Sequence, residues 1–297
     1  MPSRRTLSPQ TGMLLVTLFW GGNFTAMKIG FGQIEPLAFT ALRFALASVV
    51  LWAIVRYFEG PRRLPRPIVL RLIALGVIGN TTYQLAFVEG LARTSVTKSA
   101  LILAGMPALV TLAAWVLRVE PITLRQRWAV LVSTIGVVVV VVARGGTIEG
   151  GLGTGELLLL MGIGAWTVYT LLLRHWKLPI SALRLTAWTM YTGAPGLILI
   201  AIPQLRRTTW AGVSWTGWGA MLYAALLSLV AAYILWNRGV ATLGASRAAV
   251  YNCLVPLIAT AVAMIGLGER PGMVHVAGGG LIIVGVLMTR RAPAPEG

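Results

Sequence analysis

Long stretches of apolar residues alternate along the chain with short breaks that carry charges, prolines and glycines. A bilayer core about 30 Å thick needs roughly 20 apolar residues in a helix that rises about 1.5 Å per residue. The stretches are continuously apolar, without the alternation of membrane β-strands. They predict helices at residues 11–32, 36–57, 68–90, 96–117, 124–143, 154–174, 181–203, 214–237, 245–267 and 272–290. The pattern predicts an all-α integral membrane protein with ten transmembrane helices and no room for a soluble domain.

The composition agrees with a membrane protein. The chain is 57% hydrophobic and 11% charged, with a mean hydropathy of +0.81. A soluble domain carries about 25% charged residues, so this chain has too few of them to cover a surface in water. Its single cysteine, Cys253, excludes a secreted disulfide scaffold. The composition therefore also excludes a soluble enzyme and a disordered tail protein.

The charges carry information about topology. The chain has 25 Lys and Arg against eight acidic residues, all Glu, and a net charge of +17. Nucleic-acid binding would need a basic patch on a polar face, whereas these residues lie in short clusters between apolar runs. With the N-terminus inside, the cytoplasmic set holds 17 of the 25: Arg4, Arg5, Arg56, Arg62, Arg63, Arg66, Arg71, Arg118, Arg125, Arg127, Arg174, Lys177, Arg184, Arg238, Arg247, Arg290 and Arg291. The positive-inside rule then predicts that both termini are cytoplasmic.

The two halves of the chain repeat each other. A shift of 149 residues places helices 3–5 on helices 8–10, and a shift of 146 matches helix 1 with helix 6. The matched pairs include Pro107 and Pro256, Glu120 and Glu269, Gly136 and Gly285, and Trp20 and Trp166. Five helices per half would give the second half the opposite orientation. We expect two inverted repeats, residues 1–145 and 146–297, that open a midplane site to each side in turn.

These motifs resemble one transporter family. They are the Trp20-Gly21-Gly22-Asn23-Phe24 run, its counterpart in the repeat Trp166-Thr167-Val168-Tyr169, and the Leu42-Arg43-Phe44 run. The matched prolines Pro107 and Pro256 and the matched glutamates Glu120 and Glu269 complete the set. Their order and spacing resemble the drug/metabolite transporter superfamily, specifically its ten-helix EamA-type members. The resemblance implies two inverted five-helix repeats around a cavity lined by helices 1–4 and 6–9. It also implies export of amino acids or other small metabolites across a bacterial inner membrane.

Polar side chains within the spans are the first candidates for substrate binding, because polar groups at bilayer depth are costly. Asn23 lies in helix 1, Gln84 in helix 3, and Asn252 one turn before Pro256. Each could bind a substrate, or instead form an interhelical hydrogen bond. Pro256 and Pro107, its counterpart in the repeat, would let helices 9 and 4 bend during gating, or would form static kinks.

Aromatic side chains form a second group of candidates. Ligand sites are mostly apolar and aromatic, and ring faces attract ammonium groups. The expected aromatic lining residues are Trp20, Phe24, Tyr83, Phe87, Trp166, Tyr169, Trp188, Tyr233 and Tyr251, with Trp166, Tyr169 and Trp188 first. Met106 is expected to line the cavity as well, from the face of helix 4 opposite its stripe of small residues. Packing or lipid contact is the alternative for at least half of the aromatic residues.

Four ionisable residues are candidates for gating or charge recognition. Lys98 and its repeat mate Arg247 lie at helix N-termini, where a cation opposes the helix dipole. Each could pair with a carboxylate to close a gate, attract a substrate carboxylate, or extend to the interface. Glu89 is the carboxylate best placed for proton coupling, unless it forms a permanent salt bridge with Arg43 or Lys98.

A secondary transporter for amino acids or related metabolites is the function that the sequence favours. An exporter of drugs or nucleosides and a flippase of a lipid-linked substrate are the alternatives. A membrane-embedded enzyme would need clustered acid–base or metal ligands, and the chain has no Asp and only His175 and His275, far apart. We therefore expect no enzyme activity, metal, cofactor or nucleic-acid partner. The expected partners are a small-molecule substrate and membrane lipids, and ten helices can enclose a cavity in a monomer.

Overall fold

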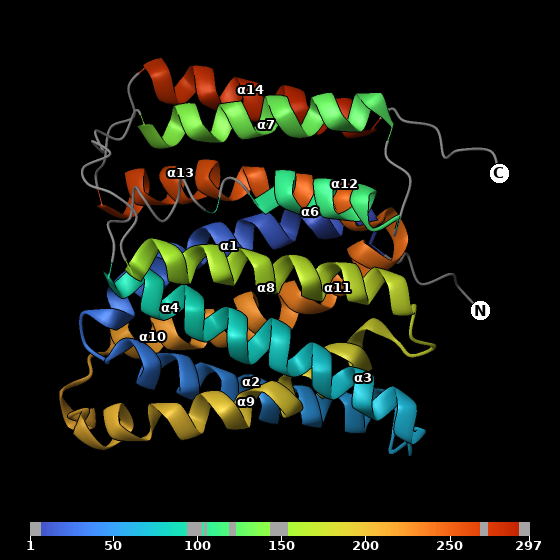
Figure 1. Ribbon diagram of the computed structural model, residues 1–297. Helices are drawn as coiled ribbons and strands as arrows, with labels where there is room; N and C mark the ends of the chain where they lie inside the picture. The colour runs from blue at the N-terminus through green and yellow to red at the C-terminus, as the bar shows by residue number, and fades with distance from the viewer. Residues whose placement is uncertain are drawn as a thin grey trace.

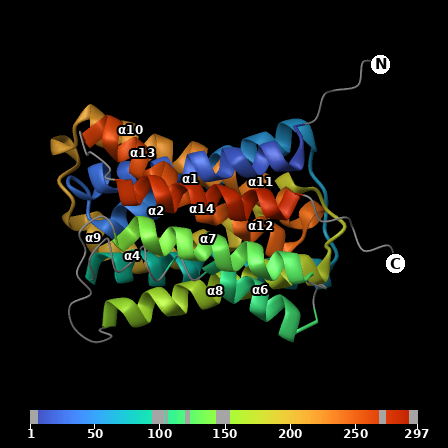
Figure 2. The ribbon, with the colours of Figure 1, turned by 90° about the horizontal axis from the view of Figure 1, so that it is seen from above.

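The computed structural model describes residues 7–93, 103, 106–118, 123–142, 154–267 and 273–290. In these ranges ten helical spans run roughly parallel through one bundle (Figures 1 and 2). The first half holds α1 (Pro9–Phe31), α2 (Pro36–Phe58), α6 (Met106–Val116) and α7 (Leu124–Val142). Its third span, between α2 and α6, consists of three consecutive elements: α3 (Arg66–Gly76), η1 (Val77–Thr82) and α4 (Tyr83–Arg93). The second half holds α8 (Thr154–Trp176), α9 (Ala182–Arg207) and α14 (Met273–Arg290). Its third span consists of α10 (Trp215–Tyr223), η3 (Ala224–Ala231) and α11 (Ala232–Leu243). Its fourth span consists of α12 (Ala245–Tyr251), η4 (Asn252–Leu254) and α13 (Val255–Leu267).

The length and composition of these spans confirm an all-α membrane protein. Five described helices are long and apolar enough to cross a membrane: Pro36–Phe58, Arg66–Arg93, Leu157–Trp176, Ala182–Arg207 and Trp215–Leu243. The predicted helix 96–117 is described only at residue 103 and from Met106 onward, as α6. A short 3₁₀ turn, η2 (Trp210–Gly212), joins α9 to α10.

The helix ends follow from local side-chain chemistry. Ser8, Ser181 and Ser214 each cap a helix, since the hydroxyl oxygen accepts a hydrogen bond from a backbone N–H three residues on. Several helices extend beyond their predicted ends, and the extension is longest for α9, which reaches Arg207, and for α11, which reaches Leu243. A proline or an arginine in the last turns interrupts the apolar pattern without ending the helix, which explains the difference.

The two halves share an irregularity that the sequence did not predict. The third and eighth spans each contain a π-helical segment, η1 and η3. The 149-residue shift places Val77–Thr82 on residues 226–231, inside η3. A π-helical segment disturbs the regular hydrogen-bond ladder, and neighbouring side chains can use the carbonyls there. The indole N–H of Trp20 donates to the Ser228 carbonyl of η3 over 3.0 Å.

The packing also repeats between the halves. Three pairs join equivalent helices: α2 with α9, α6 with α12, and α7 with α14. In addition, α8 packs on α4 and α6, and α1 packs in the equivalent way on α11 and α13. The duplicated architecture is therefore visible in the contacts of the described residues as well as in the sequence.

The basic residues gather at one end of the bundle. The start of α1 and the end of α14 lie at this end (Figure 1), which we name the basic end. Its described Lys and Arg are Arg56, Arg62, Arg63, Arg66, Arg71, Arg118, Arg125, Arg127, Arg174, Lys177, Arg184, Arg238, Arg247 and Arg290. The opposite end carries Lys28, Arg93, Arg206 and Arg207.

Two glycines that match in the repeat allow α7 and α14 to approach closely. A Cβ on Gly136 would lie 2.7 Å from the Gly278 carbonyl oxygen and 2.8 Å from the Ile282 nitrogen. A Cβ on Gly285 would lie 2.8 Å from the Ala129 carbonyl oxygen. Backbone atoms cannot move aside as a flexible side chain can, so both positions require glycine. Small residues serve the same purpose at other helix contacts in membranes.

We expect Gly136→Leu to separate α7 from α14 and to destabilise the protein by about 3 kcal/mol, the upper end for overpacking. The measurement is thermal unfolding of the purified protein in detergent, followed by tryptophan fluorescence. Gly280→Leu is the matched control, because a Cβ on Gly280 of α14 meets no atom within 4 Å. Equal losses of stability at the two positions would contradict this account of the helix contact.

Candidate functional site

Seven aromatic side chains meet near the middle of the bundle. The Trp166 ring of α8 has its centroid 5.5 Å from Trp20 of α1, 5.5 Å from Trp236 and 5.7 Å from Tyr233 of α11. The Trp166 centroid also lies 4.8 Å from Tyr83 of α4 and 5.3 Å from Tyr169. Phe87 stacks on Tyr83. We name Trp20, Tyr83, Phe87, Trp166, Tyr169, Tyr233 and Trp236 the aromatic centre.

The aromatic centre lies where the two repeats meet. Trp20 and Trp166 are repeat mates, and their rings are in edge contact. Gln84 and Tyr233 are mates under the 149-residue shift, and Gln84 Nε2 donates a hydrogen bond to the Tyr233 hydroxyl over 3.3 Å. A residue can touch its own repeat mate only close to the axis that relates the two halves. A site at this place is shared by both halves.

A polar cluster lies on the side of the aromatic centre away from the basic end. Arg43 of α2 is 1% exposed, and its Nη2 donates to Gln84 Oε1 over 2.7 Å. Its Nη1 lies 3.8 Å from Met27 Sδ, which also accepts from Asn23 Nδ2 at 3.1 Å. We name Asn23, Met27, Arg43 and Gln84 the Arg43 cluster. The Gln84–Tyr233 hydrogen bond connects it to the aromatic centre.

A second cluster of hydrogen-bonded side chains, all uncharged, lies on the side of the aromatic centre that faces the basic end. The Tyr169 hydroxyl donates to Asn237 Oδ1 over 2.7 Å, and Asn237 Nδ2 donates to Thr186 Oγ1 over 2.8 Å. All three residues are buried, with Tyr169 fully enclosed. Three spans, α8, α9 and α11, contribute to this network. Polar groups of both clusters therefore flank the aromatic rings along the bundle.

The other predicted lining residues lie at different distances from this centre. The Phe24 ring lies 6.1 Å from Phe87 and so adjoins it. Met106 Sδ is 3.7 Å from Asn252 Nδ2, between α6 and η4. Tyr251 is buried in α12. The described ring contact of Trp188 is with Tyr191, 6.4 Å away on α9, so this contact does not join it to the aromatic centre.

The predicted gating residues are dispersed. Glu89 forms a salt bridge with Arg93 on the same helix, one turn away, instead of reaching Arg43. Pro256 is the second residue of α13, directly after the 3₁₀ turn η4, and Pro107 is the second residue of α6. Arg247 lies in α12 near the basic end, and Lys98 lies outside the described residues.

Two polar members of the site were missed from the sequence. The predicted helix 214–237 ended at Asn237, which made that residue a helix terminus, whereas α11 continues to Leu243 and buries it. A rule that scores every amide within a turn of a predicted end would have found it. Thr186 carried no such signal, because threonine commonly bonds to its own helix in membranes. Its hydroxyl donates to the Ala182 carbonyl and also accepts from Asn237.

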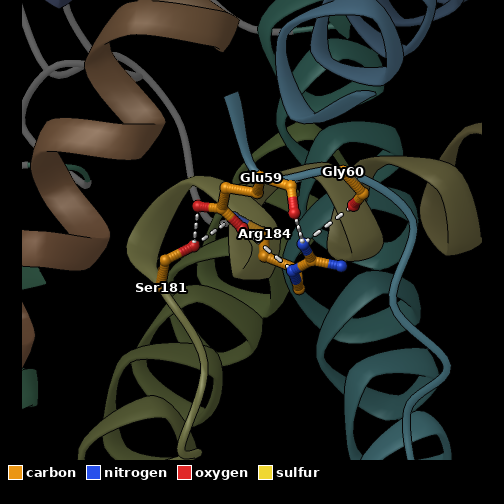
Figure 3. A network of polar contacts seen from close by, with 4 residues as sticks. All are labelled: Glu59, Gly60, Ser181 and Arg184. Carbon is orange, nitrogen blue, oxygen red and sulfur yellow. Dashed lines mark hydrogen bonds and ion pairs between the residues drawn. The ribbon is translucent and has the colours of Figure 1, made fainter. Parts of the chain in front are cut away.

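The α2–α9 pair is tied together at its basic end. Arg184 Nε donates to Glu59 Oε2 over 2.9 Å, and its Nη2 donates to the carbonyls of Glu59 and Gly60 (Figure 3). The Ser181 hydroxyl donates to the other Glu59 oxygen while it caps α9. Arg184 is 4% exposed and the Glu59 side chain 23%, so the guanidinium of this ion pair is shielded from water while the carboxylate is partly exposed. It joins the last residues of α2 to the first turn of α9.

At the opposite end of the bundle, hydrogen bonds of an uncharged side chain join α2 and α9. Gln204 Oε1 near the end of α9 accepts from the backbone N–H groups of Leu37 at 2.8 Å and Ala38 at 3.3 Å. These N–H groups belong to the first turn of α2 and lack a helical acceptor. Glu59 and Gln204 thus occupy equivalent places, since each reaches from the end of one helix to the start of the other.

Both halves of the chain match the same family. The EamA-like transporter family matches residues 9–142 and again residues 153–291. This chain belongs to the EamA-like transporter family. The EamA-like transporter is thus a multi-pass integral membrane protein with duplicated halves, and the enzyme hypothesis is excluded.

Relatives of this EamA-like transporter extend over almost its whole length. It is 29% identical over 280 residues to the "uncharacterized transporter YyaM" of Bacillus subtilis, covering 93% of this chain and 91% of that protein. It is 27% identical over 280 residues to a "probable terminal-alkyne amino-acid exporter" of Streptantibioticus cattleyicolor, covering 94% and 92%. A solved crystal structure with 19% sequence identity superposes with a TM-score of 0.78 over 96% of this chain and 98% of that chain, which supports the fold.

We expect Glu59→Ala to destabilise the EamA-like transporter by about 3 kcal/mol, because it leaves a buried guanidinium without its counter-ion. Thermal unfolding in detergent measures the loss. Arg93→Ala is the control, since it breaks the partly exposed Glu89–Arg93 pair and should cost less than about 1 kcal/mol. If the two variants lose the same stability, the Glu59–Arg184 pair does not hold α2 to α9.

Proposed function

We propose that this EamA-like transporter is a secondary transporter that exports small metabolites, with amino acids or related compounds as substrates. The observation that carries the proposal is the aromatic centre at the meeting point of the two repeats, flanked by polar groups on both sides. Aromatic walls with a few fixed polar groups suit a small amphipathic solute. The relative from Streptantibioticus cattleyicolor, named as a probable amino-acid exporter, favours the same substrate class.

Transport would proceed by alternating access between the two halves, residues 1–145 and 146–297, with one chain as the working unit. The substrate would contact the aromatic centre, and residues around it would contribute polar groups or bend. The proposed lining set is Trp20, Asn23, Phe24, Tyr83, Gln84, Phe87, Met106, Trp166, Tyr169, Trp188, Tyr233, Tyr251 and Asn252. The π-helical segments and the 3₁₀ turn before Pro256 are the places where the helices would bend most readily.

The basic end faces the cytoplasm in this proposal, and the membrane is the bacterial inner membrane. Positive charge near short loops is retained on the cytoplasmic side. A green fluorescent protein fused after residue 297 should therefore fluoresce, whereas alkaline phosphatase fused there should stay inactive. The reverse pattern would place the basic end outside.

Counterflow tests the transport function directly. Proteoliposomes with the wild-type protein are preloaded with aromatic, aliphatic, basic or acidic amino acids, and uptake of the labelled compound is measured with and without a pH gradient. Trp166→Ala should reduce uptake at least tenfold, because it removes the ring that contacts five others. Trp215→Ala, at a 91% exposed position, is the matched tryptophan control and should transport normally.

The outcome of counterflow also separates the alternatives. Exchange of nucleosides or cationic drugs in place of amino acids would assign the substrate to those classes. Scrambling of a fluorescent lipid-linked sugar would indicate a flippase. Folded protein that exchanges none of these compounds would overturn the transport proposal for the aromatic centre.

A further inference from the structure

Arg43 is a buried cation without a carboxylate partner among the described residues. Its side chain is 1% exposed, yet its described contacts are the neutral Gln84 oxygen, the Met27 sulfur and the Phe44 ring at 5.8 Å. The Nε hydrogen has no described acceptor. A buried charge is costly unless an opposite charge and hydrogen bonds compensate for it. The basic end shows that compensation at Arg184, and the Arg43 cluster does not.

The hydrogen-bond partners in the Arg43 cluster are mismatched in strength. Asn23 Nδ2 and Arg43 Nη1 both point at Met27 Sδ, and a thioether sulfur is a weak acceptor. The Asn23 Oδ1 atom has no described donor. Two strong donors therefore share a poor acceptor, while a good acceptor beside them is unused. An anionic group that replaced the sulfur would satisfy the donors.

We propose that Arg43 and Asn23 bind the headgroup of an α-amino acid, with the substrate carboxylate on the Arg43 guanidinium and the ammonium on Asn23 Oδ1. This inference rests on the transport function proposed above and narrows its substrate class to α-amino acids with a free carboxylate and a free ammonium group. The guanidinium fork matches a carboxylate with two parallel hydrogen bonds. In an α-amino acid the two charged groups are adjacent, and here a cation and an unused amide oxygen flank one sulfur atom. The substrate side chain would extend along Phe24 and Phe87 into the aromatic centre.

The repeat offers only one such binding position. Under the 146-residue shift Arg43 corresponds to Thr189, and Asn23 corresponds to Tyr169. The equivalent place in the other half therefore carries hydroxyl groups and no cation. An amino acid would bind with its headgroup toward the end opposite the basic end and its side chain toward the centre.

The first test compares substrates on the wild-type protein and needs no variant. Each amino acid that exchanges in counterflow is competed with its own amide and with its decarboxylated amine. We expect the amide and the amine to compete at least tenfold more weakly, because they lose a charge-assisted hydrogen bond to Arg43. Amides that compete as well as the acids would overturn the headgroup site while leaving amino-acid transport intact. Exchange of nucleosides or drugs without any amino acid would overturn both proposals.

The second test uses variants at Arg43. Arg43→Gln should remove the preference for the acid over its amide, and Arg43→Lys should restore part of it because the charge remains. Without substrate, Arg43→Gln should keep or raise the melting temperature, since it removes an uncompensated buried charge. A fall of several degrees would instead assign Arg43 a structural role. Asn23→Ala should weaken competition by the amino acid more than competition by the matching carboxylic acid that lacks the ammonium, and equal weakening would remove Asn23 from the site.

Discussion

The lack of water inside a bilayer is the constraint on which this structure depends. Each backbone polar group within the hydrocarbon layer must find its partner in the protein, and an unpaired polar side chain is costly there. Two hydrogen-bonded groups of buried polar side chains lie beside the aromatic centre, the Arg43 cluster on one side and the Tyr169–Asn237–Thr186 network on the other. The π-helical segment η3 follows the same logic, because the Trp20 indole donates to one of its carbonyls. The site proposed for a polar solute lies where the halves meet.

The fold could be predicted from the sequence because its causes are local and repeated. Apolar runs of bilayer length predicted the spans, whereas the match of Gly136 with Gly285 indicated only the repeat and did not predict the close contact of α7 and α14. The π-helical segments could not be predicted, since their residues have no composition that separates them from an α-helix. Which charged side chains form salt bridges could not be predicted either. The sequence offered Glu89 as a partner for Arg43, but Arg93 lies one helical turn from Glu89 and pairs with it.

The repeats share a backbone design and differ in chemistry. Trp20 and Trp166 occupy equivalent places, but only the Trp20 indole has a described acceptor, whereas Trp166 Nε1 is buried without one. Arg43 likewise has a neutral counterpart in Thr189. Two halves with identical chemistry would form a site that looks the same from both sides of the membrane. With such differences the site can favour one orientation of a bound substrate, while the matching helices of the two halves still move in the same way.

Polar groups are paired differently at the ends of the α2–α9 pair and beside the aromatic centre. At the ends of α2 and α9 the charges and helix termini are paired, through Glu59 with Arg184 and through Gln204 with the first turn of α2. Near the aromatic centre, in contrast, described donors and acceptors are left unused at Asn23, Arg43 and Trp166. A chain selected only for stability would have paired these groups or replaced them with apolar side chains, because each unpaired buried group costs free energy. Unpaired atoms of both kinds, close together and beside aromatic rings, are what a site for a zwitterionic solute requires.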